Sequence, residues 1–294
     1  MSKNEFKDCQ TAEEILRFFQ DEGRALRHTN FYHYTSLSNV NNILKSKELW
    51  LNSLAESAND NEEKDRYAEI GRNVFSVCFS TGTSESLPLW YLYSGIDGKG
   101  ARIELKKSAF KKLIGNELKI SLLEIEDGPD GRVRKGPTLT ENDYKFLCHD
   151  ILYIGKDSQK PDKYRIKYNN NTMNGVTSSC AEKIKEEYER FYKGLIWFYE
   201  KETRIQVEIN DRKLEKGKKY KVAISLESVY NDLSIRLAPE FGTVSPEIFT
   251  KYEGIREWTS AKIRPSDYAG QMHMGLRDKL CEACIFKSEN SKAK

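Results

Sequence analysis

The segment from Trp197 to Arg204, WFYEKETR, carries two carboxylates and a guanidinium at alternate positions. On a β-strand, Glu200, Glu202 and Arg204 would share one face, because successive side chains of a strand point to opposite faces. In a cleft, one carboxylate could stabilise a positively charged sugar transition state while the arginine holds the other carboxylate or binds phosphate. On an edge strand the same side chains would be hydrated and would have no such role. The segment therefore predicts a candidate catalytic group, with solvation as the alternative.

A histidine with hydroxyl-bearing neighbours occurs early in the chain, in the strand-like segment FYHYTS. Strand alternation would direct His33 and Thr35 to one face and Tyr32 and Tyr34 to the other, with Ser36 at the end. This combination predicts the edge of a ligand site. The alternative is a structural histidine that is hydrogen-bonded to the backbone.

A polar segment follows at Asn59, Asp60 and Glu63. These side chains could form a wall that fixes the hydroxyl groups of a ligand. Asparagine and aspartate together also favour a turn, and Glu63 could cap the helix that follows. The turn is the favoured interpretation for these three residues.

Two large aromatic residues, Trp90 and Tyr93, lie three positions apart in an apolar segment that is expected to be helical. Residues three apart share a helix face. Core packing is the favoured role for the pair, and a stacking surface at a pocket rim is the alternative.

Periodicity and capping signals predict the elements that must position these residues. Strands are expected at 31–35, 49–53, 74–80, 101–105, 151–154, 203–209, 220–226 and 233–237. Helices are expected at 11–22, after Ser36 or Ser38, and at 87–93, 180–197 and 245–252. Residues 127–145 are expected to form a loop that permits a hairpin, and residues 156–172 a mobile polar insertion.

The irregular order of strands and helices predicts an α+β fold with a mixed, mainly antiparallel sheet flanked by helices. A length of 294 residues fits one large domain or two small ones. We expect one core domain at 30–286 with a polar insertion around 127–175. A helical extension at 1–29 precedes it, and a flexible tail at 287–294 follows.

The composition restricts the function classes. Lys and Arg outnumber Asp and Glu by 48 to 45, which is too small an excess to imply nucleic-acid binding by itself. Two lysine-rich stretches, 106–112 and 212–221, could contact phosphates but are also typical of solvated faces. No apolar run approaches the roughly 20 residues of a membrane span. The N-terminal segment lacks the apolar stretch of a signal peptide, so we expect a cytoplasmic protein with no membrane partner.

The cysteines do not predict a metal site. Six cysteines are present, and Cys281 and Cys284 form one CxxC. Zinc needs four ligands, and no second CxxC completes a set. We also find no GxSxG, GxGxxG or Walker motif in a useful context, which argues against an ordinary dinucleotide or triphosphate cradle.

Several of these segments together resemble a widespread bacterial family of unknown function, and the resemblance covers roughly residues 30–240. The motifs occur in the order HYTS (33–36), ILKSKELWLNS (43–53), NDxxE (59–63), VCFS (77–80), LPLWYLYS (87–94), GARIEL (100–105) and WxYEKExR (197–204). Each motif is weak alone, and the ordered set is specific.

The first motif and the late glutamates of this set are similar to those of the ADP-ribosyltransferase superfamily. This resemblance implies that His33 contacts the ribose of NAD and that Ser53 or Tyr93 lines the nicotinamide pocket. It also implies that Glu200 or Glu202 supports the ribosyl cation. The implied fold is the ADP-ribosyltransferase fold, with NAD as substrate and no metal.

The resemblance thus predicts an effector that cleaves the nicotinamide–ribose bond of NAD, either as a transferase or as a glycohydrolase. The acceptor could be protein, nucleic acid or water, and the biological role a bacterial toxin or an anti-phage defence protein. Two alternatives remain open from the sequence. One is a non-catalytic module that binds a nucleotide or a partner, and the other is a nucleic-acid-binding effector.

Overall fold

The computed structural model describes residues 6, 9, 11–20, 25–57, 61–82, 86–93, 100–115, 118–126, 133–169 and 171–238. The predicted helix at 245–252, the CxxC and the predicted tail lie outside these residues. The chain divides into two compact units. The larger unit comprises Met1–His33, Ser46–Ser84 and Leu105–Leu233, and the smaller unit comprises Tyr34–Lys45, Glu85–Glu104 and Ser234–Lys294.

The described residues form a mixture of helices and strands. The helices are α1 (Ala12–Gln20), α2 (Leu37–Ser46), α3 (Leu54–Ser57), α4 (Asn61–Ile70), α5 (Leu87–Tyr93), α6 (Lys107–Leu113) and α7 (Ser178–Glu187). The strands are β1 (Asn30–Ser36), β2 (Glu48–Ser53), β3 (Val74–Ser80), β4 (Gly100–Lys106), β5 (Ile120–Ile125), β6 (Val133–Thr138), β7 (Tyr144–Asp150), β8 (Leu152–Lys156), β9 (Lys163–Tyr168), β10 (Asn171–Thr177), β11 (Tyr192–Gly194), β12 (Glu202–Ile209), β13 (Lys219–Ser225) and β14 (Ser234–Leu237). Most strand pairs are antiparallel, which confirms the predicted α+β class with a mainly antiparallel sheet.

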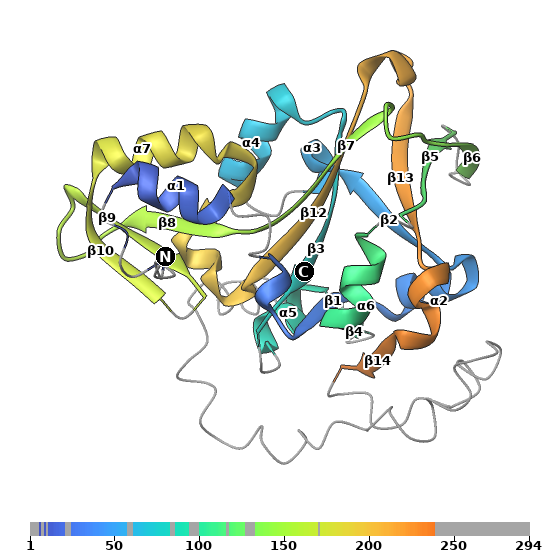
Figure 1. Ribbon diagram of the computed structural model, residues 1–294, viewed down its shortest axis with the longest axis horizontal. Coiled ribbons are helices and arrows are strands. Elements are labelled where there is room, and N and C mark those ends of the chain that lie inside the picture. Colours follow the sequence, from blue (N-terminus) through green and yellow to red (C-terminus); the bar gives the residue numbers. More distant parts are fainter. Residues whose placement is uncertain are drawn as a thin grey trace, which may run out of the picture. The chain divides into compact units, whose positions relative to one another are not determined.

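Strand β3 is the centre of the main sheet in the larger unit (Figure 1). Along one edge it pairs with β12, from Glu208 opposite Val74 to Glu202 opposite Ser80. Along its other edge it pairs with β2 at one end and with β1 at the other, where Tyr32 lies opposite Ser80. Strand β12 also pairs with β7, so it is an interior strand. The hydrated edge-strand interpretation of Glu202 and Arg204 is therefore wrong.

A second sheet in the larger unit has the order β10-β9-β8-β11. Helices α1 and α7 lie side by side along it (Figure 1). Aromatic side chains fill the space between these helices and the strands, and Phe19 packs edge-on against Tyr168 with 4.7 Å between ring centroids. Helix α1 begins as predicted, because Thr11 Oγ1 accepts from the Glu14 N–H while Glu14 Oε2 accepts from the Thr11 N–H.

The predicted long helix at 180–197 is wrong. Helix α7 ends at Glu187, a 3₁₀ helix spans Glu189–Phe191, and β11 then pairs with β8 in parallel. A second 3₁₀ helix, Leu195–Glu200, follows and ends at Lys201 in the left-handed conformation with φ 44°. The aromatic residues of this region fit a strand as well as a helix, and pairing with β8 determines the outcome.

Strands occur both in the region expected to be a mobile polar insertion and in the loop that was expected to permit a hairpin. Strands β9 and β10 pair antiparallel, with Asn171 opposite Tyr168, and Asn169 after β9 has φ 51°. Alternation in KYRIKY buries Ile166 and Tyr168 on one face, and the polar composition of the segment obscured this pattern. Residues 133–138 form β6, which pairs with β5.

The smaller unit contains helices α2 and α5 and the antiparallel pair of β4 with β14. Ser36 begins α2, where its Oγ accepts from the Asn39 N–H at 3.2 Å. The buried Arg102 donates from Nη1 to Tyr34 Oη at 2.8 Å and from Nε to Glu104 at 2.9 Å. No helix in the described part of the chain is long and apolar enough to cross a bilayer.

Gly155 lies where β8 packs closely against the Leu195–Glu200 3₁₀ helix, so a substitution at Gly155 tests the packing around Glu200. A Cβ added at Gly155 would lie 2.6 Å from Leu195 Cβ. We expect Gly155→Ala to lower the free energy of unfolding by about 1–3 kcal/mol, because Leu195 and its helix must move. Urea unfolding measures this change. The exposed neighbour on the same strand, Lys156→Ala, is the control, and an equally small effect of both changes would contradict the prediction.

Candidate functional site

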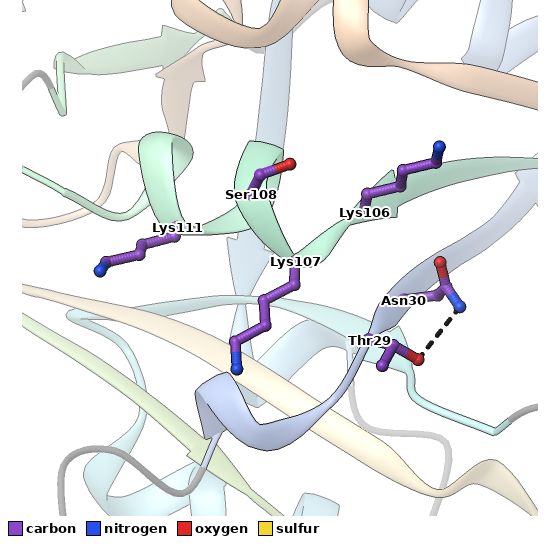
Figure 2. Close-up of a pocket in the computed structure, with 6 residues that line it drawn as sticks. All are labelled: Thr29, Asn30, Lys106, Lys107, Ser108 and Lys111. Atoms are coloured by element: carbon purple, nitrogen blue, oxygen red, sulfur yellow. Dashed lines mark hydrogen bonds between the residues drawn. The ribbon is translucent and has the colours of Figure 1, made fainter.

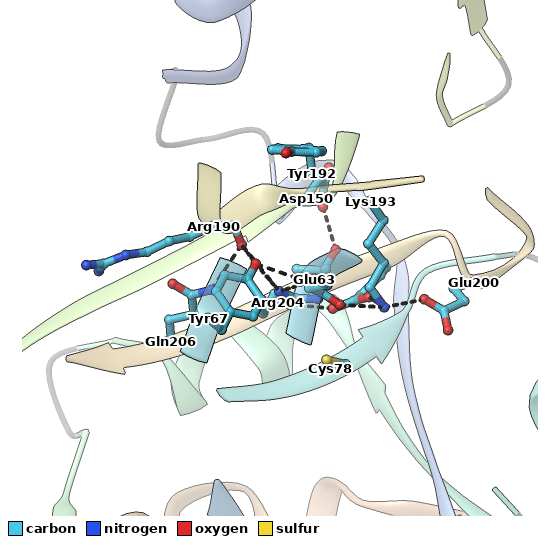
Figure 3. Close-up of polar contacts among 12 residues, drawn as sticks. Glu63, Tyr67, Cys78, Asp150, Arg190, Tyr192, Lys193, Glu200, Arg204 and Gln206 are labelled. Atoms are coloured by element: carbon cyan, nitrogen blue, oxygen red, sulfur yellow. Dashed lines mark hydrogen bonds and ion pairs between the residues drawn. The ribbon is translucent and has the colours of Figure 1, made fainter. Parts of the chain in front are cut away.

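A buried network of five charged side chains lies between α4, β11, the Leu195–Glu200 helix and β12 in the larger unit (Figure 3). Its members are Glu63, Lys193, Glu200, Glu202 and Arg204, and each exposes at most 4% of its surface. Charges this deeply buried are costly unless they are paired and hydrogen-bonded. The contacts within the network therefore decide what it can do.

Arg204 holds two of the carboxylates. Its Nε donates to Glu202 Oε1 at 2.7 Å, and its Nη1 lies 2.6 Å from Glu63 Oε1. Nη1 also donates to Tyr67 Oη at 3.1 Å and to the Arg190 carbonyl at 3.3 Å. The guanidinium is therefore fixed in one orientation on β12.

Lys193 joins the third carboxylate, that of Glu200, to the group that Arg204 forms with Glu202 and Glu63. Its ammonium lies 2.6 Å from Glu200 Oε2 and 2.7 Å from Glu202 Oε2, and Glu63 Oε2 is more distant at 3.8 Å. Figure 3 shows the lysine side chain reaching between Glu200 and the group around Arg204. Lys193 thus bridges the two glutamates that the sequence singles out.

The network has one carboxylate more than it has cations, since Glu63, Glu200 and Glu202 contact only two cations, Lys193 and Arg204, among the described residues. Burial raises the pKa of Glu200 to about 7, against the opposing effect of Lys193, and the charge of Glu202 adds to the rise. Burial alone would also raise the pKa of Glu202, but the charges of Arg204 and Lys193 hold it below its ordinary value. The two glutamates therefore differ in proton affinity, which is typical of an acid–base pair.

The two carboxyl oxygens of Glu200 have different surroundings. Its Oε2 contacts Lys193, whereas its buried Oε1 has no hydrogen-bond partner among the described residues. Most buried polar atoms in proteins are hydrogen-bonded, so an unpartnered carboxyl oxygen needs an explanation. A ligand hydroxyl or a water molecule is the kind of group that would satisfy it.

A neighbouring carboxylate, Asp150 of β7, anchors the other side of β12. It is buried and accepts from Thr203 Oγ1, from Tyr168 Oη at 2.7 Å and from His28 Nε2 at 2.8 Å. These three donors fix the carboxylate, so Asp150 positions the strand that carries Glu202 and Arg204.

His33 does not share a face with Glu202. The register of Tyr32 and Glu202 with Ser80 places these three on one face of the sheet, and strand alternation directs His33 to the other. There its ring packs 5.7 Å from the Phe79 ring. His33 Nδ1 donates to the Cys78 carbonyl at 3.0 Å, and burial lowers the pKa of the imidazole. This geometry matches the structural alternative for His33, a histidine that is hydrogen-bonded to the backbone.

The predicted hydroxyl groups have local partners. Ser53 donates to the Gly71 carbonyl at 3.0 Å, and Thr35 accepts from Asn39 Nδ2 at 2.9 Å. Ser36 is the cap of α2 described above. Of the predicted polar wall, Glu63 belongs to the network, while Asn59 and Asp60 lie outside the described residues.

The predicted aromatic residues belong to the smaller unit. Trp90 is buried and packs edge-on against Tyr34 with 4.8 Å between ring centroids. Tyr93, three residues later on α5, is half-buried. The buried position of Trp90 agrees with the favoured interpretation that it packs in the core.

Sequence reasoning missed Lys193, Tyr67 and Tyr153. Tyr67 donates to Glu63 at 3.1 Å, and Tyr153 Oη accepts from the Glu202 N–H at 2.8 Å. Lys193 did leave a signal, because it is the single cation between Phe191 and Phe198. A lone charge in an apolar run is expected to be buried and paired.

Among the described residues, no group of three or more His, Cys, Asp or Glu side chains could hold a metal ion. Comparisons with protein-family models, with curated proteins and with solved structures find no match to this chain.

Proposed function

We propose that this protein cleaves the nicotinamide–ribose bond of NAD, with Glu200 as the carboxylate that acts on the sugar. The observation that carries the proposal is the state of Glu200. This residue is buried, burial raises its pKa to about 7, and its Oε1 accepts no hydrogen bond within the described part of the chain. Glu202, the other glutamate that Lys193 bridges, has its pKa lowered instead, because Arg204 and Lys193 stabilise its charge against the effect of burial.

The chemistry requires a group of this kind. When the bond between the ribose anomeric carbon and the nicotinamide nitrogen breaks, the electron pair leaves with nicotinamide and the sugar becomes a cation. An ionised Glu200 in a dry site would stabilise that cation. A nucleophile, such as water or an acceptor hydroxyl, then bonds to the sugar and gives its proton to Glu200. A base with a pKa near neutrality suits that second role.

Glu202, Lys193 and Arg204 serve as positioning residues in this proposal. Arg204 holds Glu202 ionised, and Lys193 spans from Glu202 to Glu200 Oε2. Because Glu202 adds to the rise in the pKa of Glu200, it keeps the base in its useful range. Since Glu200 exposes only 3% of its surface, substrate binding requires the side chains that cover it to move.

The proposal extends to the features that the motif resemblance implies. These are an ADP-ribosyltransferase-like version of the α+β fold, NAD as substrate, a cytoplasmic site of action and a role as a toxin or defence effector. The mainly antiparallel sheet and the two late glutamates, with Glu202 at the start of β12 and Glu200 in the 3₁₀ helix before it, support this assignment. His33 takes no part in it, because the residue faces Phe79.

The test is NAD consumption by the purified protein, with and without cell lysate, followed by mass spectrometry of the products. We expect Glu200→Gln to reduce turnover at least a hundredfold, roughly 2.7 kcal/mol, because the amide can neither carry the charge nor accept the proton. Free ADP-ribose would indicate hydrolysis, and ADP-ribose on a lysate component would indicate transfer.

Two further variants separate catalysis from folding. Glu63→Gln removes a carboxylate of the same network that touches Arg204, and we expect this variant to keep most of its turnover when folded. In Glu202→Gln we expect the midpoint of the pH–rate profile to move to lower pH, since the charge that raises the pKa of Glu200 is lost. Equal turnover in wild type and Glu200→Gln, or no NAD consumption by folded wild type, would refute the proposal.

A further inference from the structure

The phenol of Tyr153 is buried beside the two late glutamates. Tyr153 lies on β8 opposite Lys193 in the parallel pairing with β11, so the two side chains share a face of the second sheet. Lys193 in turn lies 2.6 Å from Glu200 Oε2. Tyr153 Oη accepts from the Glu202 N–H at 2.8 Å, and its ring packs edge-on against Phe198 with 5.4 Å between ring centroids. Tyr153 is therefore held against the segment that carries Glu200.

The hydroxyl of Tyr153 has a donor that no described residue uses. Its oxygen accepts the Glu202 N–H, whereas its own proton has no acceptor within the described part of the chain. Burial raises the pKa of Tyr153, and the charge of Glu200 adds more to this rise than the charge of Glu202 does. The phenol therefore stays protonated at neutral pH, and a buried donor of this kind needs an acceptor.

Glu200 supplies the complementary group. Its side chain is 3% exposed, and its Oε1 accepts no hydrogen bond from any residue that the structure describes. An unused donor on Tyr153 and an unused acceptor on Glu200 thus lie in one buried site. Both would be satisfied by a single group that accepts one hydrogen bond and donates another. A hydroxyl group does both, whereas a guanidinium or an ammonium group only donates.

The open hollow where β4 continues into α6 offers no comparable arrangement. Three lysines and three residues with neutral polar side chains line it, at 29–30 and 106–111. Figure 2 shows Lys106, Lys107 and Lys111 pointing in three different directions, and all three are exposed. The structure therefore does not direct these lysines toward one ligand group, and the complementary pair at Tyr153 and Glu200 is the better-defined site.

We propose that Tyr153 and Glu200 together bind the nucleophile of the reaction and select one with a hydroxyl group, namely water or an alcohol. This inference rests on the proposed function, because it assigns the group that attacks the ribose. The bond between the anomeric carbon and the nicotinamide nitrogen breaks, and its electron pair leaves with nicotinamide. The nucleophile's oxygen bonds to the anomeric carbon and its proton goes to Glu200 Oε1. Tyr153 keeps its proton and donates a hydrogen bond to that oxygen throughout.

Selection among nucleophiles follows from these two hydrogen bonds. A hydroxyl group donates to Glu200 and accepts from Tyr153, so both buried groups are satisfied. The ammonium of a lysine or the guanidinium of an arginine would leave the Tyr153 O–H without an acceptor, and an unsatisfied buried donor is costly. We therefore expect alcohols to compete with water, and guanidinium compounds to be excluded.

Steady-state NAD cleavage by Tyr153→Phe tests the contact. We expect kcat to fall about tenfold, because one hydrogen bond to the nucleophile is lost, and KM for NAD to change less than about twofold. The matched control is Tyr164→Phe on the neighbouring strand β9, where the hydroxyl contacts Glu182 at 3.4 Å. We expect this control to keep the wild-type kcat. Circular dichroism verifies that both variants are folded.

Competition between nucleophiles is the second arm. Wild type and Tyr153→Phe are incubated with NAD and either methanol or agmatine, which carries a guanidinium and an ammonium group. Mass spectrometry then gives the ratio of each adduct to ADP-ribose. We expect wild type to form O-methyl ADP-ribose and no agmatine adduct. In Tyr153→Phe we expect the ratio of agmatine adduct to ADP-ribose to rise, a change that a loss of folded protein alone would not produce.

These outcomes separate the nucleophile site from the proposed function. If NAD is cleaved and Glu200→Gln is inactive, the proposed function holds. In that case an agmatine adduct formed by wild type, or a wild-type kcat in Tyr153→Phe, overturns the nucleophile site alone. Absence of NAD cleavage by folded wild type overturns both. The agmatine arm with wild type decides the question even where Tyr153→Phe does not fold.

Discussion

Arg204→Met is expected to lower the free energy of unfolding by about 3–5 kcal/mol, as is typical when one partner of a buried ion pair is removed. Arg204 is 2% exposed and contacts Glu202 at 2.7 Å and Glu63 at 2.6 Å. Methionine fills much of the volume but leaves the two carboxylates with only Lys193 as a cation. Urea unfolding near neutral pH measures the change.

The decrease in the free energy of unfolding of Arg204→Met should depend on how many buried carboxylates lose their cation. The double variant Arg204→Met/Glu63→Met removes one of the stranded carboxylates, so we expect it to recover part of the loss. At the surface, Lys112→Met breaks the ion pair with Asp232. The Lys112 side chain is 60% exposed and that of Asp232 is 48% exposed. We expect a change of less than about 1 kcal/mol there. An Arg204→Met variant as stable as Lys112→Met would show that the network adds nothing to the fold.

The strands of the main sheet could be predicted from the sequence because their signal is local. β1, β3 and β12 show apolar or alternating residues with clear boundaries, and each lies within about two residues of its predicted range. The helix of α1 was likewise predictable from the capping box of Thr11 and Glu14. In each case the local preference and the tertiary context agree.

The candidate site was only partly predictable because its geometry is not local. Glu202 and Arg204 share a strand face as predicted, but Glu200 precedes the strand in a 3₁₀ helix that turns at Lys201. Lys193, which joins the glutamates, lies on a three-residue strand that exists only through its pairing with β8. No periodic pattern in the sequence encodes that pairing.

His33 illustrates the converse case. The sequence offers a histidine among hydroxyl groups, and the strand is where it was expected. Whether such a histidine meets a distant glutamate depends on register, and a shift of one residue changes the face. The pairing of Tyr32 with Ser80 determines the outcome and directs His33 away from Glu202.

The stability of the wild-type protein is expected to decrease between about pH 5 and pH 8 relative to that of Glu200→Gln. Burial raises the pKa of Glu200 from 4.5 to about 7. A carboxyl whose pKa is raised by folding favours the folded state below its unfolded pKa, and this contribution is lost as pH rises through the folded value. Each tenfold change in proton affinity corresponds to about 1.4 kcal/mol, so the relative loss approaches about 3 kcal/mol.

Glutamine at position 200 is a neutral mimic of the protonated acid, so it removes the titration and keeps the shape. Denaturant unfolding of both proteins at a series of pH values gives the difference, in which the other titrating groups largely cancel. Glu186→Gln on the exposed face of α7 makes the same chemical change without burial, and we expect its stability to follow wild type at every pH. Parallel curves for wild type and Glu200→Gln would contradict the raised pKa.

This comparison also separates a structural from a functional role for Glu200. If Glu200 served only to stabilise the fold, replacing it should lower the free energy of unfolding measured at neutral and alkaline pH. The burial and raised pKa of Glu200 instead predict that Glu200→Gln is the more stable protein at about pH 8. Gain of stability together with loss of NAD turnover is the combination expected of an active-site group that is held in an unfavourable ionisation state. Gain of stability with NAD turnover unchanged would place the catalytic carboxylate elsewhere.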